Sequence, residues 1–165
     1  AKKSGWPILL TKRSALSTDA AVAIDAIGAN RALVLGSTSA IATSTADSLA
    51  SMLGNERVTR LAGASRYQTG LVVADYGVEN CGLSLVTPAI ATGSSFADAL
   101  AGGAMAGRLG TVLLLTPSTS LDGGVADLLL DHADTVGKPR VLGGDTAIRP
   151  IVREAIALAL IPSVQ

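Results

Sequence analysis

The stretch Thr111-Val112-Leu113-Leu114-Leu115-Thr116 decides the fold, and Gly110 and Pro117 bound it on either side. Its apolar residues are consecutive and do not alternate with polar ones. Such a run is typical of a short strand that is buried on both faces, as in parallel sheets covered by helices. A similar run, Ile8-Leu9-Leu10-Thr11, occurs 105 residues earlier (113 − 8). We therefore predict that the chain contains an internal repeat.

The match between the two copies continues beyond this strand. After a slip of two residues, Val34-Leu35-Gly36 matches Val141-Leu142-Gly143 at an offset of 107 (141 − 34), and Ala40-Ile41 matches Ala147-Ile148. A period slightly above 100 residues indicates an array of domain-sized repeats. We predict that residues 1–56 are the C-terminal half of one repeat and that residues 57–165 are one complete repeat, so that the chain is a fragment of a longer repeat protein.

Strand and helix patterns alternate along the chain. Strands are expected at 7–11, 31–35, 57–61, 87–92, 111–116 and 139–142, and amphipathic helical patterns lie between them. This alternation predicts an α/β fold made of tandem three-layer units, each with a short parallel sheet flanked by helices. Small residues crowd the helical pattern of 99–107, and close approach of a sheet or of a second domain would explain them.

Several polar residues are placed to begin helices. Ser65-Arg66-Tyr67-Gln68 and Ser95-Phe96-Ala97-Asp98 have the spacing of a capping box. Equivalent N-caps are expected in the two copies, at Ser17 with Asp122 and at Ser39 with Thr146.

Composition excludes several classes of protein. The chain has 13 Lys+Arg and 13 Asp+Glu, which argues against a basic nucleic-acid binder. With 48% hydrophobic and 16% charged residues it is not a disordered chain, and no apolar run is long enough to span a membrane. A single Cys and a single His, His132, nearly exclude a Cys/His metal site, and no cofactor is expected. His132 aligns with Ile27, so we expect a packed or rim residue and not a catalytic base.

The most distinctive motif is Arg60-Leu61-Ala62-Gly63-Ala64-Ser65-Arg66-Tyr67-Gln68-Thr69. Two arginines flank a turn from strand to helix, where free N–H groups and the helix dipole can hold a phosphate or a carboxylate. The alternative is that the arginines are structural and pair with carboxylates such as Asp98. Arg60, Ser65 and Arg66 are therefore candidate ligand contacts.

Two further loops follow strands of the predicted sheet. Gly93 and Ser94 form a tight loop after one strand, at the sheet edge where open parallel sheets bind ligands. A nucleophile elbow is not present, because position 97 is Ala, and no catalytic residue is assigned. Gly143-Gly144 precedes a helix and could hold a phosphate, although Ser37 at the position of Gly144 in the first copy favours a plain turn. Gly93, Ser94 and Gly144 complete the candidate set.

Four ordered blocks of sequence together resemble the cell wall binding repeat 2 family. They are the Arg-Leu-Ala-Gly-x-x-Arg-Tyr-x-Thr opening at 60–69, the Thr-Gly-x-x-Phe-x-Asp-Ala-Leu block at 92–100, the Leu-Leu-Thr strand at 7–11 and 112–116, and the Leu-Gly-Gly turn at 142–148. The second copy has no Pro before its strand, and the first has Gly-Ser in place of Gly-Gly. The resemblance covers nearly the whole chain.

The resemblance implies a secreted surface protein of a Gram-positive bacterium, such as an S-layer or other cell-wall protein. Its repeats would hold the protein non-covalently to the wall through an anionic secondary cell wall polymer. They would pack with other copies of the repeat as a homo-oligomer or a pseudo-threefold assembly. The alternatives are a structural assembly module without a ligand and a hydrolase-like α/β enzyme, for which the residues offer no Ser-His-Asp set.

Overall fold

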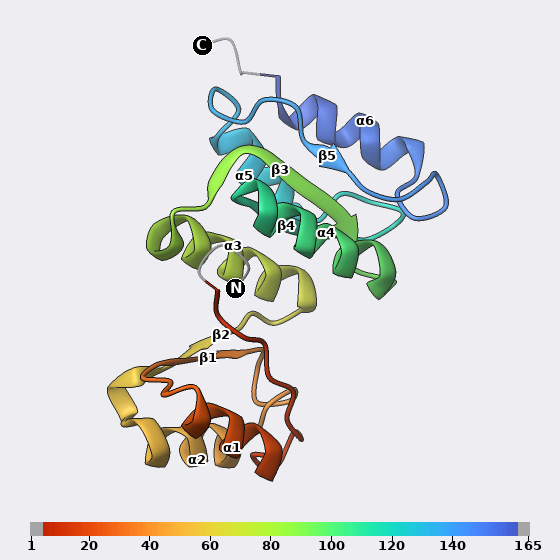
Figure 1. The fold of residues 1–165 in the computed structure, drawn as a ribbon. Coiled ribbons are helices and arrows are strands. Elements are labelled where there is room, and N and C mark those ends of the chain that lie inside the picture. The colour runs from red at the N-terminus through yellow and green to blue at the C-terminus, as the bar shows by residue number, and fades with distance from the viewer. Residues whose placement is uncertain (1–4, 162–165) are drawn as a thin grey trace. The chain divides into compact units, whose positions relative to one another are not determined.

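The computed structural model describes residues 5–161, which fold into two compact units. Pro7–Ala64 forms the N-terminal unit, and Ser65 onward, together with Gly5 and Trp6, forms the C-terminal unit. Both are mixed α/β units with short parallel sheets and flanking helices, as the alternating pattern predicts (Figure 1).

The described residues of the C-terminal unit form three parallel strands and four helices. In chain order its elements are α3 (Arg66–Cys81), β3 (Ser84–Thr92), α4 (Phe96–Leu109), β4 (Thr111–Thr116), α5 (Gly123–Asp131), β5 (Arg140–Val141) and α6 (Pro150–Ala159). The strand order is β4-β3-β5, so β3 is central. The register pairs Ile90 with Leu114 on one side and with Val141 on the other.

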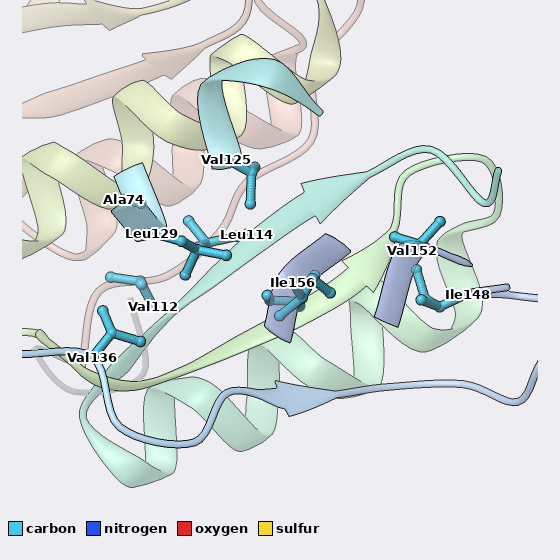
Figure 2. Packing of buried hydrophobic residues seen from close by; sticks show 10 residues of the cluster. Ala74, Val112, Leu114, Val125, Leu129, Val136, Ile148, Val152 and Ile156 are labelled. Atoms are coloured by element: carbon cyan, nitrogen blue, oxygen red, sulfur yellow. The ribbon is translucent and has the colours of Figure 1, made fainter. Parts of the chain in front are cut away.

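One face of this sheet packs on α5 and α6. Val112 and Leu114 of β4 point to the same face because side chains alternate along a strand. They meet Val125 and Leu129 of α5 and the stripe Ile148, Val152 and Ile156, as Figure 2 shows. The core is built from aliphatic side chains, in keeping with the scarcity of aromatic residues.

Helix α4 covers the opposite face of the sheet at very short range. Its buried residues are Gly102 and Ala106. A Cβ at Gly102 would collide with Leu142 Cδ1 and lie 3.3 Å from Leu113 Cδ1. The close approach of the sheet, one of the two explanations that the sequence left open, therefore explains the small residues Gly102 and Ala106, whereas Ala101, Gly103 and Ala104 are exposed.

The N-terminal unit has a two-stranded parallel sheet. Its elements are α1 (Thr18–Ala26), β1 (Ala32–Leu35), α2 (Thr43–Leu53), the short 3-10 helix η1 (Asn55–Arg57) and β2 (Val58–Leu61). Ile24, Val34 and Leu49 form its small core. Strand β2 opens the predicted complete repeat in sequence, yet it pairs with β1, in the register Leu35 with Leu61.

The strand expected at 7–11 does not form. Residues 7–11 have no strand partner in the described chain, although their counterpart, β4, pairs with β3. The side chains of Ile8 and Leu10 are 75% and 88% exposed. An apolar run alone is not sufficient for a strand, because its backbone groups need a neighbouring ladder.

The predicted helix starts are partly correct. Ser17, Ser65 and Asp122 accept a backbone N–H at the starts of α1, α3 and α5. Ser95 is the N-cap of α4 but makes no side-chain cap bond. The prediction for Ser39 and Thr146 was wrong, because the N-caps are Ala42 and Arg149.

The reason lies in the turn that precedes these two helices. The N–H groups of Ala147 and Ile148 donate to Gly144 O, and those of Ala40 and Ile41 donate to Ser37 O. A separate turn therefore contains Ser39 and Thr146, and each helix begins after it. In the second copy Pro150 occupies the first helical position, where its missing N–H costs nothing.

The two copies share their local hydrogen bonds as well as their sequence. Thr116 Oγ1 accepts from Asp122 N and donates to Ser120 O, and Thr11 Oγ1 does the same with Ser17 N and Ala15 O. This threonine fixes the turn from the apolar run into the next helix in both copies.

Candidate functional site

The carboxyl ends of β3, β4 and β5 meet at one edge of the C-terminal sheet. Gly93 N donates to Thr116 O at 2.9 Å, and the hydroxyls of Thr92 and Ser118 are hydrogen-bonded at 2.9 Å. Arg149 N donates to Ser118 O at 3.1 Å, which ties the loop before α6 to the loop after β4. We call these three loops, residues 93–95, 117–122 and 142–149, the carboxyl edge.

Arg66 and Gly93 are in direct contact at this edge. The Arg66 Nη1 group donates to Gly93 O at 2.7 Å, from the first residue of α3 to the end of β3. Gly93 is buried, and a Cβ there would lie 2.5 Å from Cε1 of the Tyr67 ring. Glycine is required because the start of α3 packs directly on the loop backbone. Arg66 is an exposed residue, and its guanidinium carries further N–H donors for a ligand.

The side chains of Ser65 and Ser94 differ in their structural roles. Ser65 Oγ accepts from Gln68 N at 3.2 Å, so this hydroxyl caps α3. Ser94 is exposed, and its N–H donates to the buried Thr92 Oγ1 at 3.1 Å. That bond holds the loop in a tight turn and leaves the Ser94 side chain at the surface.

Gly144 lies at the same edge, in the turn between β5 and α6. Its carbonyl accepts from Ala147 N at 2.9 Å and from Ile148 N at 3.0 Å, and a Cβ there would meet nothing within 4 Å. Its neighbour Gly143 has φ 94°, and the Asp98 carboxylate lies beside it. The structure therefore requires glycine at position 143. Position 144 has no neighbouring atom that would exclude a side chain.

Arg60 belongs to the N-terminal unit. Its Nη1 group donates to Gly36 O at 2.7 Å, and Gly36 is the counterpart of Gly143. In the C-terminal unit a different arginine makes the equivalent contact, because Arg153 Nη2 donates to Gly143 O at 2.7 Å. Arg153 also lies 3.7 Å from the Asp145 carboxylate.

The structure therefore groups five of the six predicted contacts in one unit and places Arg60 in the other. Arg66, Gly93, Ser94 and Gly144 lie at the carboxyl edge, and Ser65 precedes Arg66 at the start of α3. Both predicted arginines hold glycine carbonyls. The carboxylate partner considered for them, Asp98, is instead beside Gly143.

Sequence reasoning missed the cations and the apolar side chains around this edge. Arg149 is exposed at the N-cap of α6, and Arg153 follows one turn later. Phe96 and Leu100 of α4 are 80% and 72% exposed, and no role at the surface was predicted for either of them. The signal was the spacing: with Gly102 and Ala106 facing the sheet, positions 96 and 100 lie on another face of the helix.

The single histidine of the chain lies away from the carboxyl edge. His132 is exposed at the C-cap of α5, consistent with the rim position expected for it. Within residues 5–161 there is no cluster of three or more His, Cys, Asp or Glu side chains placed to bind a metal ion. In that same span no helix has the length and apolar character needed to cross a membrane.

Comparison with known proteins identifies the family. Residues 60–153 match the family of the cell wall binding domain 2 (CWB2), from the Arg60 motif into α6. The chain belongs to the CWB2 family. It therefore carries a cell-wall-binding domain. The match includes all but one of the elements of the C-terminal unit in full, namely α3, β3, α4, β4, α5 and β5, and it ends within α6.

The relatives are much longer than this chain. N-acetylmuramoyl-L-alanine amidase LytC of Bacillus subtilis (strain 168) is 27% identical over 129 residues, which are 78% of this chain and 24% of LytC. Among solved structures, Cwp8 from Clostridium difficile has a TM-score of 0.76 at 24% identity, over 96% of this chain and 26% of Cwp8. Cwp6 from Clostridium difficile has a TM-score of 0.80 at 18% identity, over 93% and 23%. The chain spans about a quarter of each relative, and the two structures support its fold.

Proposed function

We propose that this chain is a non-covalent cell-wall anchoring module that binds an anionic secondary cell wall polymer at the surface of a Gram-positive bacterium. The observation that carries the proposal is the carboxyl edge of the C-terminal unit. There the exposed Arg66, at the start of α3, donates to the loop after β3, and the exposed Arg149, at the N-cap of α6, donates to the loop after β4. Membership of a wall-binding family and similarity to LytC, Cwp6 and Cwp8 support the wall as the site of action.

The chemistry of this edge suits a phosphate or carboxylate of a polymer. Arg66 and Arg149 supply charged donors, and α4 begins without a side-chain cap, so its first N–H groups remain available to an acceptor. Asp145 is paired with Arg153, which reduces its repulsion of an anion. In this proposal Ser94 and Gly144 contact the ligand beside Arg66, Ser65 and Gly93 shape the loop, and Arg60 serves a separate contact in the N-terminal unit.

Each such contact is weak, and repetition supplies the affinity. An exposed arginine contributes up to about 1 kcal/mol to an ion pair. Repeated contacts along one polymer act at high effective concentration and bind tightly together. The repeat boundaries that we propose, residues 1–56 and 57–165, suit this mode of binding. Association with other copies, as a homo-oligomer or a pseudo-threefold set, would multiply the contacts.

Co-sedimentation with purified Gram-positive cell walls tests the proposal. Retention should be lost when the walls are extracted with acid to remove their anionic polymers, and it should weaken as salt is raised. Equal retention on intact and extracted walls would refute the polymer as ligand. No retention on either wall would refute anchoring by this chain and leave the assembly module as the better hypothesis.

A pair of charge variants tests the place of binding. Arg149→Gln removes a side-chain charge at the carboxyl edge and leaves the backbone N–H that binds Ser118. Lys138→Gln removes a charge from an equally exposed residue before β5, at the amino end of the strand. We expect Arg149→Gln to reduce wall affinity roughly two- to fivefold and Lys138→Gln to leave it unchanged. The opposite ranking would place the ligand elsewhere on the unit.

A further inference from the structure

Strand β2 occupies a defined edge of β1 in the N-terminal unit. Gly36 N donates to Leu61 O at 2.8 Å, and Arg60 returns a bond to Gly36 O at 2.7 Å. The glycine after β1 is therefore held by backbone and side chain of the same incoming strand. Because β2 begins the repeat that follows in sequence, the sheet of one repeat is extended by the opening strand of the next.

The corresponding strand of the C-terminal unit is β5, which lies at the end of the sheet order β4-β3-β5. Leu142 N donates to Ile90 O of β3 at 2.8 Å. Backbone groups of successive residues point to opposite edges of a strand, so the N–H groups of Val141 and Gly143 face away from β3. This outer edge of β5 corresponds to the edge of β1 that β2 occupies, because Gly143 corresponds to Gly36.

The local geometry of the two edges is the same. Gly36 and Gly143 have φ values of 103° and 94°, and each is followed by the same turn. The carbonyl that Arg60 holds in one copy is held by Arg153 in the other. Arg153 belongs to α6 and not to a strand beside β5. In the part of the chain that the structure describes, no strand therefore occupies the outer edge of β5, the position that β2 occupies beside β1.

We propose that the outer edge of β5 is a docking site for a strand of the β2 type, the opening strand of another repeat with the pattern Val-x-Arg-Leu-Ala-Gly. The incoming strand would run parallel to β5, accept from Val141 N and Gly143 N, and place its arginine on Gly143 O. Pro139 lies on the same edge and has no N–H, so pairing is confined to the carboxyl end of β5. Repeats would then be linked by exchange of strands, independently of any wall ligand.

Strand addition is tested by extending the full chain with a duplicate of Val58–Ala64 fused after Gln165. The residues that follow α6 in the sequence outnumber the four that join α2 to β2, so the duplicate can reach β5. We expect the amide hydrogens of Val141 and Gly143 to exchange at least about tenfold more slowly and the melting temperature to rise.

The matched control is the same extension with the duplicated Thr59 replaced by Pro. Leu61 faces β1, so Thr59, two residues earlier, faces it too, and Pro removes that donor from the ladder. Equal exchange at Val141 and Gly143 in the two extended chains would overturn the proposal, even if both melt at a higher temperature.

A second substitution tests the role assigned to the incoming arginine. Arg153→Ala removes the side chain that now holds Gly143 O. Its effect on the melting temperature should be smaller in the extended chain, where the duplicated Arg60 can take over the carbonyl. An equal loss in the extended and original chains would refute the predicted placement of that arginine.

Discussion

Replacing Gly143 by alanine should destabilise the C-terminal unit, whereas replacing Gly144 should not. Gly143 has φ 94°, a backbone conformation that residues with a Cβ rarely adopt. An added Cβ would lie 2.6 Å from Ala147 Cβ and 2.5 Å from Asp98 Oδ2. At Gly144 an added Cβ would meet nothing within 4 Å. The two adjacent glycines are therefore a matched pair of sites. At Gly143 the backbone conformation and the packing require glycine, and at Gly144 they do not.

The magnitude follows from two separate costs. A non-glycine residue held at an unfavourable φ costs about 1–3 kcal/mol. Overpacking against neighbours that cannot move away costs typically ~1–3 kcal/mol. Asp98 can rotate but Ala147 Cβ cannot, so we expect a total of roughly 3 kcal/mol for Gly143→Ala and less than about 0.5 kcal/mol for Gly144→Ala. For a unit of this size, 3 kcal/mol lowers the melting temperature by more than about 10 °C.

Urea denaturation followed by circular dichroism measures both variants against the original chain. Similar free energies of unfolding for Gly143→Ala and Gly144→Ala would refute this account of the turn. The first copy agrees with this expectation. It has glycine, Gly36, at the position of Gly143, with φ 103°, but it has Ser37 at the position of Gly144.

Four further substitutions test the packing of the C-terminal unit. Leu129→Ala empties a fully buried position of the core and should lower the free energy of unfolding by about 2–5 kcal/mol in urea titrations, so a loss under 1 kcal/mol would contradict the packing described. In α4, Gly103→Ala should stabilise the helix by about 0.5–1 kcal/mol through helix propensity and so raise the melting temperature. Gly102→Ala should lower the melting temperature, because the added methyl group collides with Leu142. Shifts of the same sign for both variants would be evidence against the close approach of α4 to the sheet. Asp122→Ala removes the N-cap of α5 and should cost about 1 kcal/mol, which thermal unfolding would reveal, whereas an unchanged melting temperature would mean that the cap is dispensable.

The fold could be predicted from sequence wherever a pattern depends on burial. The run 111–116 became β4. Of the apolar stripe that the sequence shows from Ile148 to Ala159, Ile148, Val152 and Ile156 are buried, whereas Ile151 is 62% exposed. Such patterns are reliable because removing apolar surface from water is the largest favourable term, and its periodicity is visible along the chain.

Pairing partners could not be predicted in this way. Residues 7–11 carry a strand pattern but remain unpaired in the described structure, since a strand requires a neighbour that the pattern does not specify. Strand β2 was predicted to exist, but its partner could not be predicted: it pairs with β1, on the other side of the repeat boundary that we predict at residue 57. The sequence pattern did not indicate that β2 would belong to the same compact unit as β1.

The candidate site was predictable as far as loops could be placed at the ends of parallel strands. This placed Gly93, Ser94 and Gly144 at one edge of the sheet, as observed. The arginine contacts depended on long side chains crossing between elements, and no local pattern indicates that Arg66 reaches Gly93 or that Arg153 reaches Gly143. Exposure of Phe96 and Leu100 followed only from knowing which face of α4 the sheet requires to be small.

The differences between the two copies limit how a ligand can be recognised at the turn after β5. Ser37 replaces Gly144, and both copies keep the same pair of backbone bonds in the turn, to Ser37 O in the first and to Gly144 O in the second. A ligand that both copies bind at this turn would therefore have to be recognised by backbone N–H groups, whose positions are the same in the two copies. Side-chain charge differs instead, because Arg153 stands where the first copy has Ala46. Such repeats can thus keep one backbone geometry at this turn while the charge beside it differs from copy to copy.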